Sequence, residues 1–426
     1  MKNSAQHQSW TINVGFGPAT AALAIAIVFA LTALVTPFAQ AQTFTVLHSF
    51  TGGGDGAHPV GTLTIEGGGS LYGTTSWGGM NNCTPWYECG TVFKLSHRNA
   101  NWILQTLYTF DPTTGQDGYG PAGQLARDSS GILYGTTDSG GKKGWGSVFE
   151  LKPSPTRPVS VIAPWTEIRL HDFASSGDGA EPYNGDLLLD SAGNLYGTTF
   201  SGGKYEAGTV YKMTPSNGGW TYVVLYSFSG GNNGANPVAG VVLDAAGNLY
   251  GTTYDGGYYG EGVVYQVTPS GAETVLYNFT GGNDGSLSYA GVIFDQSGNL
   301  FGATAFGGSG GAGVVFELSP GSGGWSYKEI YPLPGNGWGA YERLVMDGGG
   351  NLYGTLFEGT YSGYGSVFKL TPSNGGWTYT SLHDFTDGDD GANPYGGLVL
   401  DSNGNLYGTT EAGGAFGYGA VFEITP

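Results

Sequence analysis

The stretch "GNLYGTTYDGGYYGEGVVYQVTP", Gly247 to Pro269, alternates short runs of Leu, Tyr, Val and Thr with clusters of glycine. Short apolar or β-branched runs bounded by Gly, Asn, Asp or Pro are typical of strands joined by tight turns. The stretch therefore predicts a β-hairpin, with one strand at Leu249 to Tyr254 and the next at Gly262 to Pro269.

The same hairpin recurs along the chain, at spacings of 51 to 62 residues. One further strand is expected before it, as in "PVAGVVLD" (Pro237 to Asp244), and one after it, as in "ETVLYNF" (Glu273 to Phe279). Seven units of four short strands predict an all-β, seven-bladed β-propeller, whereas a β-helix or β-roll, the alternative, has a much shorter period. The repeats are marked by Leu71-Tyr72-Gly73, Leu133-Tyr134-Gly135, Leu195-Tyr196-Gly197, Leu249-Tyr250-Gly251, Leu300-Phe301-Gly302, Leu352-Tyr353-Gly354 and Leu406-Tyr407-Gly408.

The ring must close on itself, and the chain stops after the third strand of its last unit, "GAVFEITP". The missing fourth strand is at the other end, because "FTVLHSF" (Phe44 to Phe50) matches the fourth strands "YVVLYSF" and "YTSLHDF". We expect this N-terminal strand to complete the last blade beside Ala420 to Thr425, which hides two sheet edges.

Three recurring residue types have structural interpretations. Gly251 and its counterparts are expected to allow close approach of the neighbouring blade, and the third-strand aromatic, such as Tyr265, is expected to fill the space between blades. An acidic residue precedes each Leu-aromatic-Gly strand and predicts a turn cap, with calcium ligation as the alternative. These acids are Glu66, Asp128, Asp190, Asp244, Asp295, Asp347 and Asp401.

Residues 1–41 differ from the rest of the chain. They contain one Lys and no acid, an apolar run from Ala19 to Val35, and "AQA" at Ala39 to Ala41. This is the pattern of a secretory signal cleaved after Ala41, and an uncleaved membrane anchor is the alternative. The prediction is an exported, monomeric propeller over residues 42–426, secreted, periplasmic or on the cell surface.

The expected mature chain is strongly acidic. Without the first 41 residues, 13 Lys and Arg face 33 Asp and Glu, a formal charge of −20. Such a surface repels nucleic acid and anionic lipid, so neither is an expected partner. The two cysteines, Cys83 and Cys89, predict a local disulfide, because an exported protein meets oxidising conditions and no further Cys or His is near enough to complete a metal site.

The compound pattern "NLYGTT..GG...GTVFKLTP" followed by "W.Y..LYSF.GG.DGANP" resembles the GloVer tandem repeat of exported bacterial choice-of-anchor proteins. The likeness covers nearly the whole mature chain, and a looser likeness exists to NHL-type propeller repeats. The resemblance implies an exported or surface protein and carries over no catalytic residue. Such proteins often end in a C-terminal sorting anchor, from which this chain departs by ending at Pro426.

Function on a propeller resides in loops, and topology places two loop classes at one end of the ring. The first class, from each fourth strand to the next first strand, contains one Asp-Gly or Asn-Gly per blade, and we expect these side chains to ring the channel mouth. They are Asp55, Asp117, Asp178, Asn233, Asp284, Asn336 and Asp390. His58 and Glu181 belong to the same loops.

The second class, from second to third strand, adds aromatic side chains to that face. Aromatic plates beside carboxylates suit sugar rings, and the same oxygens suit calcium; good turn chemistry alone is the competing structural interpretation. The candidates are Trp77, Trp86, Trp145, Tyr205, Tyr258, Tyr259, Phe306, Tyr361, Tyr364, Phe416 and Tyr418.

The sequence favours a binding or structural module over an enzyme. The motif HExxH and a phosphate loop are absent from the sequence, and His48, His171 and His383 are expected to pack in place of tyrosines. Three functions are open: glycan or other extracellular ligand binding, a carbohydrate-active enzyme that uses mouth carboxylates, and a purely structural adhesion role. Glu181, Asp186 and Glu342 are the acids that an enzyme hypothesis would test first.

Overall fold

The computed structural model describes residues 42–79, 89–99, 101–114, 117–153, 165–335, 337–359 and 363–425. Thr43–Thr425 form one compact unit, and the predicted signal segment lies outside the described residues. Within the described ranges there is no helix long and apolar enough to cross a membrane.

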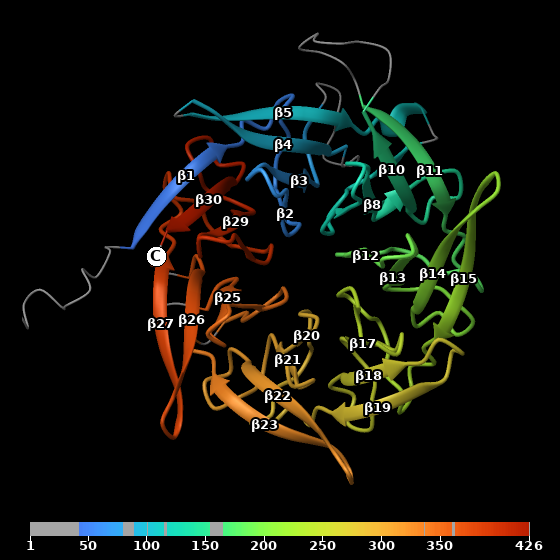
Figure 1. The fold of residues 1–426 in the computed structure, drawn as a ribbon, viewed down its shortest axis with the longest axis vertical. Coiled ribbons are helices and arrows are strands. Elements are labelled where there is room, and N and C mark those ends of the chain that lie inside the picture. Colours follow the sequence, from blue (N-terminus) through green and yellow to red (C-terminus); the bar gives the residue numbers. More distant parts are fainter. Residues whose placement is uncertain are drawn as a thin grey trace, which may run out of the picture. The chain divides into compact units, whose positions relative to one another are not determined.

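Seven four-stranded antiparallel sheets lie around a central axis and form a seven-bladed β-propeller (Figure 1). The innermost strand of each blade is only two residues long, shorter than the eight residues that the sequence indicated for Pro237 to Asp244. These inner strands are β2 (Thr64–Ile65), β7 (Ala126–Arg127), β12 (Leu188–Leu189), β16 (Val242–Leu243), β20 (Ile293–Phe294), β24 (Val345–Met346) and β28 (Val399–Leu400).

The second and third strands form the hairpin that the opening stretch predicted. The second strands are β3 (Leu71–Thr75), β8 (Leu133–Thr137), β13 (Leu195–Thr199), β17 (Leu249–Thr252), β21 (Leu300–Ala303), β25 (Leu352–Leu356) and β29 (Leu406–Thr410). The third strands are β4 (Thr91–Arg98), β10 (Ser147–Lys152), β14 (Thr209–Ser216), β18 (Val263–Val267), β22 (Val314–Gly321), β26 (Ser366–Ser373) and β30 (Ala420–Thr425).

The outermost strands close the blades, and the last of them comes from the N-terminal part of the chain. Strand β1 pairs antiparallel with β30 from Thr43 opposite Thr425 to Ser49 opposite Ala420, so the predicted ring closure is confirmed. Blade 7 is therefore β28, β29, β30 and β1, and the outer strands are β1 (Thr43–Ser49), β5 (Asn101–Thr109), β11 (Thr166–Asp172), β15 (Gly219–Ser227), β19 (Glu273–Asn278), β23 (Gly324–Pro332) and β27 (Gly376–Asp384).

The core lies between blades, and the third-strand aromatics occupy it as predicted. Phe93 is fully buried and packs with Phe50 and Val421, which belong to the neighbouring blade 7 and its connection. The expectation for the second-strand glycines needs correction: a Cβ on Gly73 would lie 2.5 Å from Cζ of Phe93, its cross-strand partner. The glycine therefore makes room for an aromatic ring of its own blade.

The acidic turn residues cap the turns before the second strands. One Oδ of Asp244 accepts the N–H groups of Ala246 and Asn248, each at 2.8 Å, and the other accepts the Asn248 side chain and the Tyr250 hydroxyl. The same pattern holds at Asp190 and Asp347. These hydrogen bonds favour the turn-cap prediction for the acids.

Within the described ranges, two short elements lie outside the blades. They are the 3₁₀ helix η1 (Pro112–Thr114) and the two-stranded sheet of β6 (Gly118–Tyr119) with β9 (Ser139–Gly140).

Candidate functional site

The two predicted loop classes meet at one end of the ring, which we call the loop face. In blade 2 they pair through β6 and β9, and in blade 6 the Glu358 N–H donates to the Trp338 carbonyl at 3.1 Å. In the other blades isolated bridges join the two loops, and blade 3 has two of them. The bridges are Ala57 with Trp77, Ala180 with Ser201, Ser176 with Gly203, Ala235 with Asp255, Ser286 with Phe306, and Ala392 with Ala412.

His58 and Glu181 occupy equivalent positions that connect neighbouring blades. The His58 N–H donates to the Tyr418 carbonyl at 3.0 Å, and the Glu181 N–H donates to the Trp145 carbonyl at 3.0 Å. Both residues have positive φ, 53° and 54°. The His58 imidazole Nδ1 lies 3.1 Å from the Glu411 carbonyl oxygen, and burial lowers the pKa of the imidazole. The structure thus gives both candidates a role in blade-to-blade contact.

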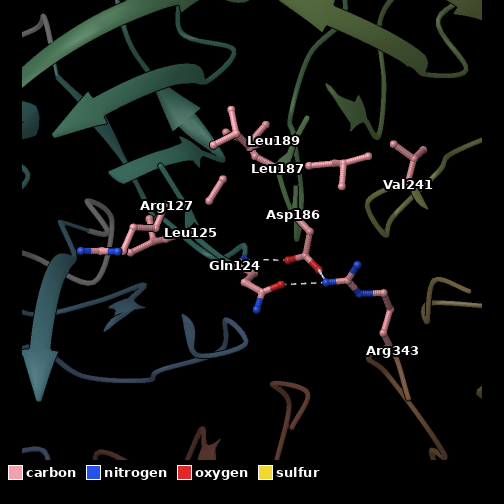
Figure 2. A pocket seen from close by; sticks show the side chains of 10 residues that line it. Gln124, Leu125, Arg127, Asp186, Leu187, Leu189, Val241 and Arg343 are labelled. Carbon is pink, nitrogen blue, oxygen red and sulfur yellow. Dashed lines mark hydrogen bonds and ion pairs between the residues drawn. The ribbon is translucent and has the colours of Figure 1, made fainter. Parts of the chain in front are cut away.

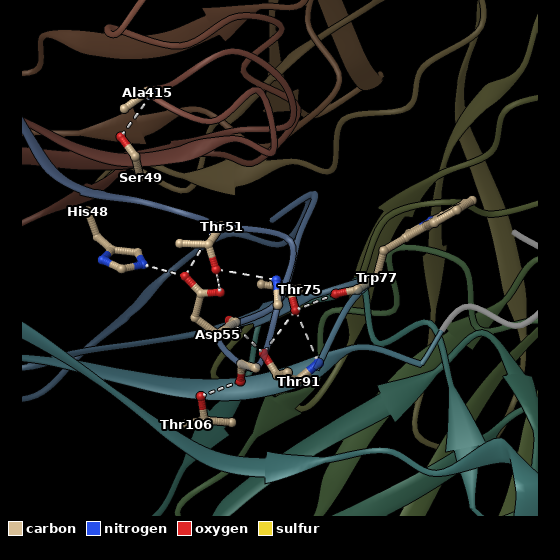
Figure 3. A network of polar contacts seen from close by, with 11 residues as sticks. His48, Ser49, Thr51, Asp55, Thr75, Trp77, Thr91, Thr106 and Ala415 are labelled. Carbon is tan, nitrogen blue, oxygen red and sulfur yellow. Dashed lines mark hydrogen bonds and ion pairs between the residues drawn. The ribbon is translucent and has the colours of Figure 1, made fainter. Parts of the chain in front are cut away.

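The Asp-Gly carboxylates do not ring the channel mouth, which corrects that expectation. The Asp55 carboxylate accepts the Thr51 N–H at 3.0 Å and contacts His48 Nε2, on outer strand β1, at 3.1 Å (Figure 3). Each counterpart likewise contacts the outer strand seven or nine residues earlier, so the carboxylates lie at the outer ends of the loops. The contacts are His171 with Asp178, His383 with Asp390, Tyr108 with Asp117, and Tyr277 with Asp284.

These contacts also explain the histidines of the outer strands. Three outer strands carry histidine where other blades have tyrosine, namely His48, His171 and His383. In these blades an imidazole nitrogen, rather than a phenol hydroxyl, contacts the Asp-Gly carboxylate. In blade 4 the turn residue is Asn233, which hydrogen bonds to Tyr226. Asn336 lies outside the described residues.

Exposed aromatic side chains concentrate on the loop face. Among the described residues, twelve large apolar side chains are exposed and nine of them are aromatic; all nine lie in the two loop classes. The three exposed aliphatic residues, Ile103, Ile168 and Val223, lie on outer strands. The aromatic side chains, with their exposed fractions, are Trp145 (42%), Tyr183 (40%), Tyr205 (51%), Tyr258 (70%), Tyr259 (56%), Trp338 (38%), Tyr364 (39%), Phe416 (58%) and Tyr418 (43%).

The remaining aromatic candidates lie differently. Trp77 is half-buried, and its ring packs edge-on against the His58 ring, with 5.7 Å between the ring centres. The centre of the His58 ring also lies 6.3 Å from that of Tyr418. Phe306 contacts Trp338 at 4.7 Å. Trp86 and Tyr361 lie outside the described residues.

A group of tyrosines that was not among the predicted site residues lies at the mouth of the channel. The rings of Tyr289 and Tyr341 stack at 4.5 Å, and Tyr395 lies 4.9 Å from Tyr341. The Tyr395 hydroxyl donates to that of Tyr183, 3.3 Å away. Since Tyr395 belongs to blade 7 and Tyr183 to blade 3, this contact crosses the ring axis. We call Tyr183, Tyr289, Trp338, Tyr341 and Tyr395 the mouth cluster.

A sequence signal for the mouth cluster did exist. Tyr289, Tyr341 and Tyr395 each precede the turn acid of their blade by six residues, and Tyr183 precedes Asp190 by seven. An alignment of the repeats on that acid, rather than on the glycine loops, would have shown an aromatic residue at the entrance of four blades.

Polar side chains from three blades meet in the channel (Figure 2). Arg343 Nη2 lies 2.7 Å from Gln124 Oε1 and 3.2 Å from Asp186 Oδ2, and the Gln124 N–H donates to Asp186 Oδ1 at 2.6 Å. A cavity of about 250 Å³ adjoins them, with Leu125, Leu187 and Val241 among its lining residues. Asp186, one of the acids named from the sequence, is therefore paired with Arg343.

One position in the repeat generates this network. Four residues before the turn acid, the blades carry Thr62, Gln124, Asp186, Gly240, Gly291, Arg343 and Gly397. The glycines leave space for their polar neighbours: a Cβ on Gly240 would lie 2.7 Å from Asp186 Cβ, and a Cβ on Gly291 would lie 3.0 Å from Arg343 Cγ.

Glu342 is the second buried acid of the channel. It is 3% exposed, like Asp186. Burial first, and the nearby Asp186 carboxylate second, raise the pKa of Glu342 well above its usual range, although Arg343 opposes the shift. This environment favours the neutral form of the Glu342 carboxyl.

Two predictions stay untested at this site. Among the described residues no group of three or more His, Cys, Asp and Glu is arranged to hold a metal ion, and calcium binding stays a prediction. The disulfide between Cys83 and Cys89 also stays a prediction, because Cys83 lies outside the described residues.

The fold and the loop face define an all-β propeller built from one tandem repeat. The chain belongs to the Gloeobacter/Verrucomicrobia repeat family, whose pattern matches residues 27–163, 159–333 and 274–426. This family assignment confirms the resemblance drawn from the repeat motif.

Solved structures share the fold at low sequence identity. One is the extracellular domain of a protein described as a one component system from B. thetaiotaomicron, with a TM-score of 0.53 and 12% identity over 90% of this chain. The match spans 40% of that chain. Another is the polysaccharide lyase Uly1, with a TM-score of 0.50 and 10% identity over 92% of this chain and 94% of that one. No curated protein matches the chain.

Proposed function

We propose that this protein is an exported binding module that holds polysaccharide on its loop face. The observation that carries the proposal is the one-sided distribution of exposed aromatics, since all nine on described residues lie in loops of that face. Exposed apolar patches on a soluble protein commonly mark a binding surface. Five blades present such a side chain in the loop between the second and third strands, so a long ligand would meet several of them.

The chemistry of the face favours a sugar chain over an apolar ligand. Sugar rings place C–H groups against aromatic faces and offer hydroxyls to polar groups at the ring edge. The mouth cluster supplies phenol hydroxyls beside its ring faces, such as those of Tyr183 and Tyr395. The exposed members Tyr183 and Trp338 are the groups that a ligand would touch first.

Export is part of the proposal. The first 41 residues carry the composition of a secretory signal, and one protein of similar fold is an extracellular domain. A sugar polymer is a ligand that an exported protein meets in the envelope or outside the cell.

The proposal is tested by measuring how the protein binds a panel of insoluble and soluble polysaccharides. Two double variants of the loop face are compared with a third, matched control variant. Tyr183→Ala with Trp338→Ala removes the exposed part of the mouth cluster, and Tyr258→Ala with Tyr259→Ala removes a loop-tip pair. We expect the mouth variant to lose at least about tenfold in affinity, which corresponds to about 1.4 kcal/mol.

The matched control is Ile103→Ala with Val223→Ala, two similarly exposed apolar residues on outer strands (43% and 48%). This control should bind as the unmodified protein does, and thermal unfolding should show that all variants are folded. Failure to bind any polysaccharide, or equal losses in all three variants, would leave the structural or protein-binding role ahead.

One observation favours a carbohydrate-active enzyme as the second candidate. Asp186 and Glu342 are neighbouring buried acids, and burial beside Asp186 raises the pKa of Glu342, the direction that a general acid requires. Both are 3% exposed, however, and Asp186 is paired with Arg343, so neither carboxyl is open to a substrate in this structure. Release of reducing ends or unsaturated sugars that is abolished by Glu342→Gln would support the enzyme.

A further inference from the structure

Carboxylates greatly outnumber cations on the loop face. Besides the Asp-Gly carboxylates, acidic residues are frequent in the described loops. They include Asp138, Glu206, Asp255, Glu261, Glu358, Asp387, Asp389 and Glu411. The Lys and Arg residues in the same described loops are Lys142, Lys143, Lys204 and Arg343. A ligand that approaches this face therefore meets a negative potential.

Three of the four cations of the face are engaged by its own groups, and the fourth, Lys142, lies at the outer end of its loop, where its backbone N–H donates to the Asp172 carboxylate of β11 at 2.9 Å. Arg343 contacts both Asp186 and Gln124, Lys143 lies 4.0 Å from an Asp178 carboxylate oxygen, and Lys204 lies 4.9 Å from the centre of the Tyr205 ring. Arg343 is the member of this set that lies in the channel, and its charge is matched by Asp186.

Acids lie close to the mouth cluster itself. Asp255 acts electrostatically on Tyr289, and Glu358 acts on Tyr341. Burial, with these neighbours, raises the pKa of both tyrosines, so their hydroxyls stay protonated. The mouth cluster thus combines neutral aromatic groups with an acidic border.

We infer that the mouth cluster selects uncharged sugar chains and rejects chains that carry uronic acid or sulfate groups. This inference rests on the proposed function and assigns a ligand class to the same site. A uronic acid brings one carboxylate per sugar, and at the mouth cluster each would lose water contacts beside carboxylates of the same sign without gaining a free cation, because Arg343 is paired with Asp186. An uncharged sugar avoids both costs and still provides ring faces and hydroxyls.

The inference is tested with matched pairs of polymers that differ in the oxidation of C6: glucan with glucuronan, galactan with galacturonan, and mannan with mannuronan. Affinity electrophoresis at about 20 mM and about 500 mM salt measures each pair, because salt screens repulsion between exposed charges. We expect the neutral member of a bound pair to bind at least about tenfold more tightly at low salt, with the gap narrowing at high salt.

A variant that removes two acidic charges near the mouth cluster shows whether charge repulsion or a poor fit of shape weakens the binding of uronans. Asp255→Asn with Glu358→Gln should raise the ratio of uronan to neutral affinity several-fold, whereas Glu329→Gln on outer strand β23 should leave that ratio unchanged. Equal or tighter binding of a uronan by the unmodified protein overturns the inference and leaves the proposed function standing. If no polymer of any pair binds, the proposed function fails and this inference fails with it.

Discussion

At the residue scale, the blade-to-blade contact depends on a backbone conformation that only some residues tolerate. His58, Glu181, Asn236, Leu287 and Asn393 occupy one repeated position with φ between 50° and 57°. Asparagine is suited to this left-handed region, whereas leucine is strained there. In addition, the side chains of Asn236 and Asn393 donate to carbonyls of the preceding blade, at 2.9 and 3.1 Å.

We therefore predict that Leu287→Asn stabilises the protein by about 0.5–1 kcal/mol, because it relieves the strain and can donate to the equivalent carbonyl, that of Tyr254. Urea unfolding measures the change. The reverse substitution at the matched position, Asn236→Leu, should destabilise by a similar amount, and a stabilising effect of both would contradict the explanation.

The turn acids predict a defined response to pH. Burial alone would raise the pKa of the Asp244 carboxyl, but hydrogen bonds from the Asn248 side chain and backbone, and from Tyr250, outweigh it and lower the pKa. A lowered folded-state pKa gives stability that is present above the unfolded-state pKa and is lost as pH falls through the folded one. Asp190 and Asp347 behave in the same way.

Asp244→Asn should consequently cost about 1 kcal/mol at pH 7 and much less at about pH 3. Urea unfolding across that range gives the difference between the variant and the unmodified protein. Asp389→Asn, in an exposed loop, is the control and should show little effect at either pH. A cost that stays constant down to about pH 3 would show that the charge of the carboxylate is not involved.

At the scale of the strand, the second-strand glycine and the third-strand aromatic act as a pair. A Cβ on Gly302 would lie 2.5 Å from Cζ of Phe316, which is fully buried. Gly302→Ala should destabilise by about 1–3 kcal/mol, because a packed core has no room for the added methyl group. Phe316→Leu should recover part of that loss in the double variant, although it is destabilising alone. A double-mutant cycle measures the coupling, and purely additive effects would contradict the pairing.

The same elements show what the sequence could predict and why. Hairpins such as Leu249 to Pro269 are local, so their strands and turns follow from residue pattern. The closing strand could be predicted because Phe44 to Phe50 repeats a motif whose partners were already assigned. The inner strands could not be sized in this way, because Gly240 and its equivalents bend away to the channel, and the contacts that fix this path come from other blades.

At the scale of the whole molecule, the channel contacts join blades that are not neighbours. These contacts explain why the site was predicted only in part: the loop face follows from topology, but the convergence of Tyr183 with Tyr395 depends on the size of the ring. Asp55 and its equivalents were expected at the mouth because they share the right loops. They lie at the outer ends because their partners, such as His48, are on outer strands.

The channel ion pair should be important for the stability of the ring. Arg343→Met leaves Asp186, 3% exposed, without its cation, and breaking a buried pair in this way costs about 3–5 kcal/mol. Arg343→Met combined with Asp186→Asn should be more stable than Arg343→Met alone, because no buried charge remains. Thermal unfolding of both variants measures this difference, and equal stability would show that Asp186 does not depend on Arg343.

Glu342 provides the opposite case. Burial and the neighbouring Asp186 raise its pKa in the folded protein, so the folded state binds a proton that the unfolded state releases once pH exceeds its ordinary pKa. Stability should then fall as pH rises from that value toward the folded-state pKa. Glu342→Gln keeps the side chain neutral and removes this dependence. The variant should unfold at a higher temperature than the unmodified protein at pH 8, with a smaller difference at pH 5. An equal or larger gain at pH 5 would mean that the neutral carboxyl, rather than its ionisation, limits the stability of the channel.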